Sequence, residues 1–316
     1  AQTSQPIYII GEHRLTNLAI RNTLTEGESL ITGFVVSNPS TATLLVRATG
    51  PSLSSLGVVG TMSNPKLQVI NSAGRVVAEN DDWSPERPPS SAENPAWSIQ
   101  NASVMVGAFP LDNGSRDAAV VVTLPPGAYT LVISGSTAVD AGVVLGEVYH
   151  MPVLEALSVA VARGNKPSSR LVNLSVRGRI AGSVDMIGGF VVGGGLAGLG
   201  SIDGGPIAPL TKRYLIRVVG PALAGFGVTG TLADPTLELA GTAGTVLQSN
   251  DNWEADPAAA ATIRAATTAA GAFPLPAGSR DAAVVVRLQE GAYTVLARGL
   301  NGATGVGLIE IYELAD

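Results

Sequence analysis

The hexapeptide Gly114-Ser115-Arg116-Asp117-Ala118-Ala119 returns unchanged as Gly278-Ser279-Arg280-Asp281-Ala282-Ala283. Further motif pairs keep the same order on both sides of it: Asn80-Asp81-Asp82-Trp83 with Asn250-Asp251-Asn252-Trp253, Gly127-Ala128-Tyr129-Thr130 with Gly291-Ala292-Tyr293-Thr294, and Glu147-Val148-Tyr149 with Glu310-Ile311-Tyr312. Similarity that keeps its order and spacing marks a duplicated structural unit. The chain is therefore a tandem repeat, with one copy in each half.

The two copies differ in their loops, which is where related modules usually acquire different roles. The second copy has a Gly- and Pro-rich insertion at 193–212, and the first has a longer Pro- and Ser-rich stretch at 84–106. Within the insertion, the run at 193–198 matches the letters of the dinucleotide-binding fingerprint. The first copy lacks this run and no strand–helix–strand unit surrounds it, so it indicates a flexible loop.

Short β-rich runs broken by turn residues fill each copy. In the first copy they lie near 16–21, 30–37, 44–49, 66–70, 75–78, 118–124, 129–134 and 143–149. An Ala-rich segment at 257–270 predicts a short helix, and its Pro-interrupted counterpart in the first copy is less clearly helical. The pattern predicts an all-β fold of two tandem β-sandwich domains, of jelly-roll or immunoglobulin-like type, each with at most one short helix.

The repeats set the expected domain limits. They give an N-terminal arm at 1–13, a first sandwich at 14–149, a connector at 150–169 and a second sandwich at 170–316. The arm holds an apolar, strand-like run that needs a sheet edge to pair with, Ile7-Tyr8-Ile9-Ile10. That edge belongs either to its own module or to a neighbouring molecule, in which case the run is an assembly element.

The repeated motifs around Trp83, Arg116, Tyr129 and Tyr149 resemble a repeat module of exported proteins from environmental bacteria. That module is similar in layout to the pre-peptidase C-terminal-like β-sandwich domains, and the resemblance covers nearly all of both copies. It implies a non-catalytic appendage or surface protein, and some relatives bind calcium or polysaccharide. No enzyme domain accompanies the two copies in this sequence, so we expect the repeats themselves to carry the function.

The amino-acid composition excludes several classes of function. Charged residues make up 14% of the 316, against roughly 25% in ordinary soluble domains, and the formal net charge is −6. Without a basic run, nucleic acid and anionic membranes are unexpected partners, and no apolar run is long enough to span a bilayer. The absence of cysteine excludes disulfides and thiolate chemistry. The opening Ala-Gln-Thr-Ser-Gln suits a chain whose signal peptide has been removed, which predicts an extracellular or cell-surface location.

The acidic turns are the best polar candidates for a metal site. Clustered oxygen ligands on a loop suit Ca²⁺, and the candidate ligands are Asp81, Asp82, Glu86, Asp251, Glu254 and Asp256. The alternative is that Asn and Asp side chains close a turn at a strand end while the following tryptophan caps the core. The spacing is not that of an EF-hand, and Asn252 replaces one aspartate, which favours the turn.

Other polar residues receive structural interpretations. Arg47 and Arg217 lie in apolar strands, where a buried guanidinium needs a carboxylate, and Glu147 and Glu310 are the expected partners. Arg116-Asp117 and its counterpart Arg280-Asp281 are ligand-binding pairs or, more simply, residues that order a loop. Trp97, in the long stretch of the first copy, has no counterpart in the second. This makes it the candidate ligand-stacking residue.

Two function classes follow. The first is a non-enzymatic structural protein of the cell surface, a self-assembling subunit of a filament, layer or adhesive coat whose partners are copies of itself. The second is an extracellular polysaccharide-binding module, with calcium as the one conceivable cofactor. An enzyme such as a glycosidase ranks last, because no catalytic pair of carboxylates stands out.

Overall fold

The computed structural model describes residues 14–37, 41–83, 96–151, 171–181, 185–193 and 211–315. The strands of the first repeat are β1 (Arg14–Leu24), β2 (Ser29–Val36), β3 (Ala42–Thr49), β4 (Pro65–Asn71), β5 (Val76–Asn80), β6 (Ala118–Leu124), β7 (Gly127–Gly135) and β8 (Gly142–His150). Those of the second are β9 (Leu171–Ile180), β10 (Met186–Gly193), β11 (Lys212–Val219), β12 (Pro235–Ala240), β13 (Val246–Asn250), β14 (Ala282–Leu288), β15 (Gly291–Gly299) and β16 (Gly305–Glu313). The helices are α1 (Pro51–Ser54), α2 (Ala96–Val106) and α4 (Pro257–Ala269), with 3₁₀ turns η1 (Pro221–Phe226), η2 (Thr242–Gly244) and η3 (Leu300–Gly302).

The strands form where the sequence alternates between core and solvent. In β2, Leu30 and Phe34 are buried while Ile31 between them is only half-buried, as expected when successive side chains point to opposite faces. All eight strands predicted for the first repeat are present. Gly74, at φ 76°, closes the predicted turn between β4 and β5, and its N–H donates to the Asn71 carbonyl at 2.9 Å.

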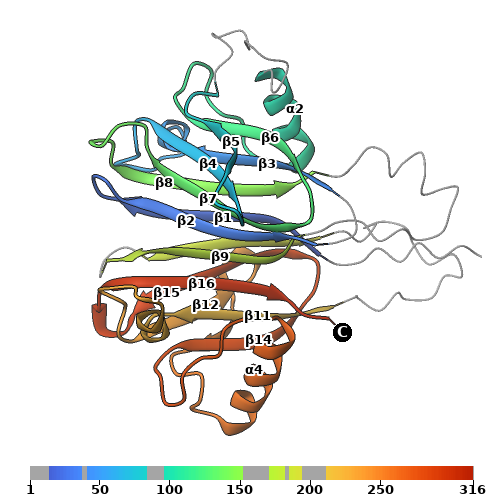
Figure 1. Ribbon diagram of the computed structural model, residues 1–316, viewed down its shortest axis with the longest axis vertical. Coiled ribbons are helices and arrows are strands. Elements are labelled where there is room, and N and C mark those ends of the chain that lie inside the picture. The colour runs from blue at the N-terminus through green and yellow to red at the C-terminus, as the bar shows by residue number, and fades with distance from the viewer. Residues whose placement is uncertain are drawn as a thin grey trace, which may run out of the picture.

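The strands form two antiparallel rows, each built from both repeats (Figure 1). The first row runs β14-β11-β16-β9-β2-β7-β4-β5. The second row runs β6-β3-β8-β1-β10-β15-β12-β13. A single pairing of Leu15 with Leu171 joins the rows into one hydrogen-bonded network. Both sheets therefore continue from one repeat into the other.

The first strand of each repeat is the point of exchange. β1 pairs with β8 of its own repeat and with β10 of the other, and β9 pairs with its own β16 and with β2. Replacing each strand by its counterpart in the other repeat converts one row into the other, so the molecule has a pseudo-twofold symmetry. The division into one domain per repeat stays a prediction, and the sheets themselves are shared.

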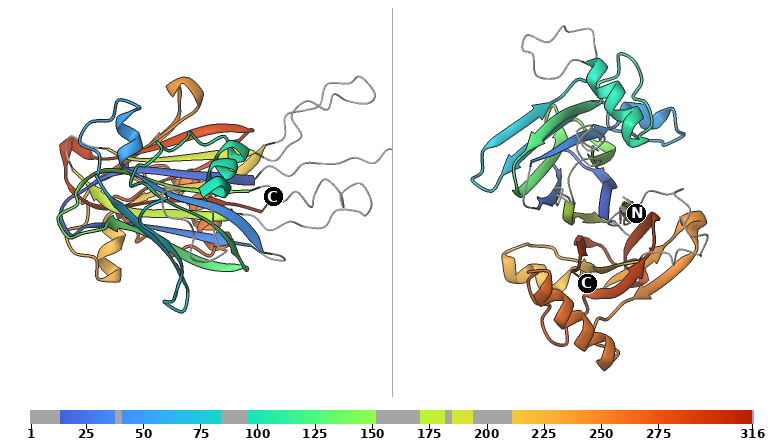
Figure 2. Two further views of the ribbon diagram at one scale, coloured as in Figure 1. Left: turned by 90° about the horizontal axis from the view of Figure 1, so that it is seen from above. Right: turned by 90° about the vertical axis from the view of Figure 1, so that its right-hand side faces the viewer.

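The main core lies between the two rows and draws on both repeats. It contains Ile20 and Val192 from the second row together with Leu30, Ile133 and Ile311 from the first, all at 1% exposure or less. Two smaller clusters lie between the sheets and the helices, one under α2 and one under α4. Figure 2 shows these helices at opposite ends of the molecule. The fold is the all-β sandwich that the sequence predicted, except that the first repeat has two helices, α1 and α2, where at most one was expected.

The two longer helices differ in how clearly the sequence predicted them. α4 begins at Pro257, as expected, and its N-terminal residue Asp256 caps it. α2 occupies the end of the Pro- and Ser-rich stretch, where the sequence signal for a helix was weak. Ile99 and Ala102 are buried in the cluster below α2, and this tertiary contact outweighs the poor local signal. No helix within the described ranges is long and apolar enough to cross a membrane.

Candidate functional site

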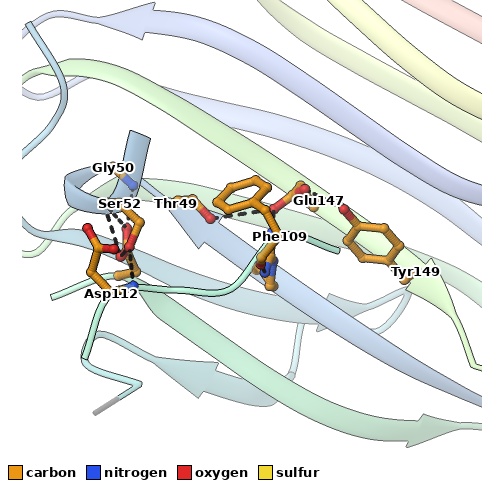
Figure 3. A network of polar contacts seen from close by, with 9 residues as sticks. Thr49, Gly50, Ser52, Phe109, Asp112, Glu147 and Tyr149 are labelled. Carbon is orange, nitrogen blue, oxygen red and sulfur yellow. Dashed lines mark hydrogen bonds and ion pairs between the residues drawn. The ribbon is translucent and has the colours of Figure 1, made fainter. Parts of the chain in front are cut away.

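A buried arginine–glutamate pair lies on neighbouring strands of the first repeat, as predicted. Arg47 on β3 and Glu147 on β8 stand opposite each other in the sheet. The guanidinium donates to Glu147 Oε2 from Nε at 2.8 Å and from Nη2 at 2.6 Å, and both side chains are almost fully buried. Tyr149 donates its hydroxyl hydrogen to the other carboxylate oxygen at 2.5 Å, so both oxygens are engaged (Figure 3).

The third nitrogen of Arg47 ties a distant loop to this cluster. Nη1 donates to the Phe109 carbonyl oxygen at 2.7 Å, and the Phe109 ring lies 4.4 Å from the guanidinium carbon. Burial, and after it the charge of Glu147, raises the pKa of the Tyr149 hydroxyl far above its usual range. The tyrosine therefore stays a hydrogen-bond donor at neutral pH. Each charged group of the cluster therefore already has a protein partner.

The second repeat repeats this cluster residue for residue. Arg217 hydrogen-bonds and ion-pairs with Glu310, and its Nη1 donates to the Phe273 carbonyl oxygen at 2.6 Å. Tyr312 donates to Glu310 Oε1 at 2.6 Å. The predicted pairing is therefore confirmed in both copies, whereas the phenylalanine and the tyrosine were not predicted as its partners.

Asp117 and Asp281 order a loop, which is the simpler of the two interpretations that the sequence allowed. Asp117 is fully buried and accepts hydrogen bonds from Gly50 N at 2.7 Å and Ser115 Oγ at 2.5 Å. Asp281 accepts from Gly220 N at 2.8 Å, while its neighbour Arg280 pairs with Asp234 instead. The repeated motif therefore orders the loop that enters α1 or η1 through its aspartate, and its serine accepts a hydrogen bond from the buried tryptophan.

The first acidic turn is held by an asparagine amide. Asn80 Nδ2 donates to the Asp82 carbonyl oxygen at 3.0 Å, and Asn80 Oδ1 accepts from Ala119 N at 2.9 Å. Asp81 and Asp82 are exposed residues, although the Asp82 carboxyl is partly desolvated. Partial burial, followed by the Asp81 charge, raises the pKa of the Asp82 carboxyl. Trp83 is buried and donates from Nε1 to Ser115 Oγ at 2.9 Å, which confirms its predicted capping position.

The acidic residues of the second turn already have separate partners. Glu254 pairs with Arg264 and accepts from Gly278 N, and Asp256 Oδ1 accepts from Ala258 N at 2.8 Å as the cap of α4. Asp251 is exposed. Within the ranges that the structure describes, no group of three acidic or histidine side chains gathers in a geometry for a metal ion. The calcium site therefore stays a prediction.

Several predicted site residues lie outside the described residues. These are the arm residues Ile7, Tyr8, Ile9 and Ile10, and the acidic residue Glu86. For Trp97 the structure describes only the backbone, which belongs to the first turn of α2 and not to a loop. Neither the strand donation by the arm nor ligand stacking by Trp97 is tested here by geometry, and both stay predictions.

The outer edge strands are a candidate assembly site that the sequence did not single out. β5 ends one row and β13 ends the other, so each has a strand partner on one side only within the described chain. Their exposed apolar side chains are Val76, at 41%, and Val246 and Leu247, at 52% and 43%. β13 contains no charged residue, whereas Glu79 of β5 accepts a hydrogen bond from Gln68 and pairs with Lys66.

The opposite ends of the two rows are protected. Ala119 N of β6 and Ala283 N of β14 donate to the side chains of Asn80 and Asn250, and α2 and α4 pack over these strands. Asn80 and Asn250 are the last residues of β5 and β13, so these outer edge strands contact β6 and β14 through their ends, in the same way in both repeats. An uncharged run directly before the second acidic turn was the sequence signal for β13.

Comparison with known proteins names no family for this chain. No family model matches it, and neither does any curated protein. Among solved structures, vicilin from hazelnut (Corylus avellana) is 8% identical over 93% of this chain and 75% of that chain, with a TM-score of 0.18. The VP2 subviral particle of infectious bursal disease virus is 12% identical over 98% and 74%, with a TM-score of 0.13. At those TM-scores neither structure bears on what this chain does.

Proposed function

We propose that the chain is a non-enzymatic extracellular structural protein, a cell-surface subunit that assembles with its own copies through β-edge contacts. The observation that carries the proposal is the uncharged, solvent-exposed edge strand β13. Edge strands template pairing with other chains, and soluble proteins usually protect them with lysine, proline, a bulge or a covering segment. β13 carries neither lysine nor proline, and its side chains at 246–249 are all exposed. Its pairing with β12 does contain one irregularity, a register shift between Leu239 and Ala240.

The pseudo-twofold arrangement gives the subunit two such edges. β5 belongs to the first repeat and β13 to the second, and they end different rows. Pairing of β13 in one copy with β5 in the next is a head-to-tail contact, and such contacts build an open filament unless the rotation closes a ring. Glu79 on β5 faces no like charge from β13, so the two edges are electrostatically compatible. The location outside the cell is supported by the low charge and by the resemblance to exported modules.

The test is the assembly state of the full-length chain and of an edge-blocked double variant, Val246→Lys with Leu247→Lys. Two lysines on one edge add charges that would lose their hydration in every joint, and lysine is a residue with which soluble proteins protect their edge strands. We expect filaments of the wild type by electron microscopy and light scattering, and monomers of the variant. Since both substituted side chains are exposed, the variant should keep the wild-type thermal midpoint.

The matched control is Val59→Lys with Val139→Lys, which adds the same charge at exposed valines outside the strands. This control should still polymerise. A wild-type protein that stays a monodisperse monomer would overturn the proposal and leave polysaccharide binding as the hypothesis to test. Filaments that survive the edge-blocked variant but vanish when residues 1–13 are removed would assign the contact to the arm instead of β13.

A further inference from the structure

An open groove crosses the outer face of the first row at the junction of the two repeats. It lies over β2 and β9 and has a volume of about 330 Å³, within the range of small-molecule sites. Its floor includes Thr130 on β7, and Ser175 and Arg177 on β9. Gly33 leaves space in the groove between them because it has no side chain. A Cβ at that position would come within 2.5 Å of Ser175 Oγ.

Arg177 brings an unneutralised charge to this groove. Its cross-strand neighbours are Ile31 and Leu308, neither of which can pair with a guanidinium. Glu310, two residues along β16 from Leu308, is already bound to Arg217. Among the described residues no carboxylate pairs with Arg177, although it is half-buried. A guanidinium partly removed from water and without a counter-ion favours an anionic ligand.

The wall of the groove is apolar and aromatic. Leu223 and Phe226 come from η1, and Phe226 packs edge-on against Phe273 at a centroid distance of 4.8 Å. Phe273 also contacts Arg217, whose guanidinium carbon lies 4.3 Å from the ring centroid. Phe226 is nevertheless 64% exposed, so a large apolar surface beside Arg177 remains open to water.

We propose that this groove binds a small amphiphilic carboxylate, with the carboxylate on Arg177 and the hydrocarbon tail along Phe226 and Leu223. Thr130 and Ser175 supply hydroxyls beside the charged end. A sugar is a poorer match, because these two hydroxyls and one guanidinium are few polar partners for a ring of hydroxyl groups. The volume suits a short chain instead of a long one. The proposal is independent of filament assembly, since no residue of β5 or β13 lines the groove.

The first repeat supplies a matched comparison within the same molecule. By the repeat alignment, Arg21 corresponds to Arg177, Ala19 to Ser175 and Leu56 to Phe226. The equivalent surface thus keeps the arginine, a threonine (Thr294) and the inner phenylalanine (Phe109), but lacks the Ser175 hydroxyl and the exposed Phe226 ring. We therefore expect carboxylate binding at the second-repeat side only.

The experiment uses octanoate as the probe, with 1-octanol as its uncharged match, in calorimetric titrations of the full-length protein. Arg177→Gln should weaken octanoate binding by about tenfold or more, which is the loss expected for a hydrogen-bonded charge contact. Arg21→Gln, the control, should leave it unchanged. Octanol should bind more weakly than octanoate to the wild type and be indifferent to Arg177→Gln.

Phe226→Leu, which introduces the residue of the first repeat at an exposed position, should weaken octanoate and octanol alike without affecting the fold. It keeps the proposal testable if Arg177→Gln is unstable in thermal denaturation. The proposal is overturned if the wild type binds no octanoate at millimolar concentration. It is also overturned if Arg177→Gln and Arg21→Gln weaken octanoate binding equally, or if neither Arg177→Gln nor Phe226→Leu weakens it.

Discussion

Asp82 is the residue at which the two acidic turns differ, because Asn252 takes its place in the second repeat. Partial burial is the larger cause of its raised pKa, and the neighbouring Asp81 charge adds to it. A pKa that is raised in the folded state means that the charged carboxylate is less favourable in the fold than in the unfolded chain. The turn itself is held by Asn80, which both repeats share as Asn250.

We expect Asp82→Asn to raise the free energy of unfolding slightly at neutral pH, because it removes a charge that the fold disfavours. The gain is fully present above the folded pKa and shrinks as the pH falls through that pKa. It vanishes below the unfolded value of about 3.9, where the carboxyl is protonated in both states. Urea denaturation of both proteins between about pH 3 and pH 7 measures the difference.

The same variant separates the turn from a calcium site when the titration is repeated with EDTA and with calcium chloride. If Asp82 binds calcium, the metal stabilises the wild type more than Asp82→Asn. Equal midpoints of the wild type in both buffers would favour the turn. A loss of stability in Asp82→Asn at neutral pH with EDTA present would contradict the expected sign.

The buried ion pairs show what could be predicted at the level of the residue. A guanidinium in an apolar strand needs a carboxylate, so the sequence alone predicted Glu147 as the partner of Arg47. The Phe109 carbonyl oxygen, which completes the guanidinium's partners, could not be found in this way. It is brought there by a loop that returns over the outer face of the sheet, and nothing in the local sequence encodes that path.

At the scale of the element, α4 depends on the cap at its N-terminus. Asp256 Oδ1 accepts hydrogen bonds from Ala258 N at 2.8 Å and Ala259 N at 3.4 Å. These satisfy two of the amide groups that the first turn of a helix leaves without partners. Further along, Ile263 and Ala266 bury one face of α4 against β14 and Trp253.

We expect Asp256→Ala to lower the free energy of unfolding by about 1 kcal/mol, the usual effect of removing an N-cap. Asp256→Asn is the control, because an asparagine oxygen accepts the same hydrogen bonds and should retain most of the stability. Urea denaturation monitored by circular dichroism measures both. An equal loss in the two variants would show that the charge of Asp256, and not its acceptor oxygen, supports the helix.

The two helices also show why elements are unequally predictable. α4 follows a capping aspartate and proline and is rich in alanine, all of which are local signals. α2 follows a stretch with several prolines, and it is held in place by Ile99 and Ala102 in the cluster that contains Trp83. Contacts between residues distant in sequence determine that α2 forms. The local sequence therefore indicated this helix only weakly.

For the whole molecule, the repeat and the eight strands of its first copy could be predicted, but the order of the strands could not. Leu24 ends β1 and Ser29 begins β2, and the turn between them carries the chain from one row to the other instead of closing a hairpin. A turn of this length is compatible with either outcome. The choice depends on which strand of the other repeat is available, and alternation of buried and exposed residues does not encode that partner.

The exchanged first strands predict the behaviour of one repeat by itself. Residues 14–151 alone lack β10 and β9, which leaves the backbone of β1 and β2 without partners on one side of each strand. Two copies can restore both pairings, because the β2 of one fragment can occupy the place of β10 beside the β1 of the other. We therefore expect the fragment to sediment as a dimer whose thermal midpoint rises with concentration, since dimerisation and folding are then linked.

The variant Val76→Lys, which blocks pairing at the edge strand β5, is the control and should leave this dimer intact. A stable fragment monomer with a concentration-independent midpoint would show that β1 and β2 can pair within one repeat. The sharing of sheets would then follow from the tandem linkage and not be a condition of folding.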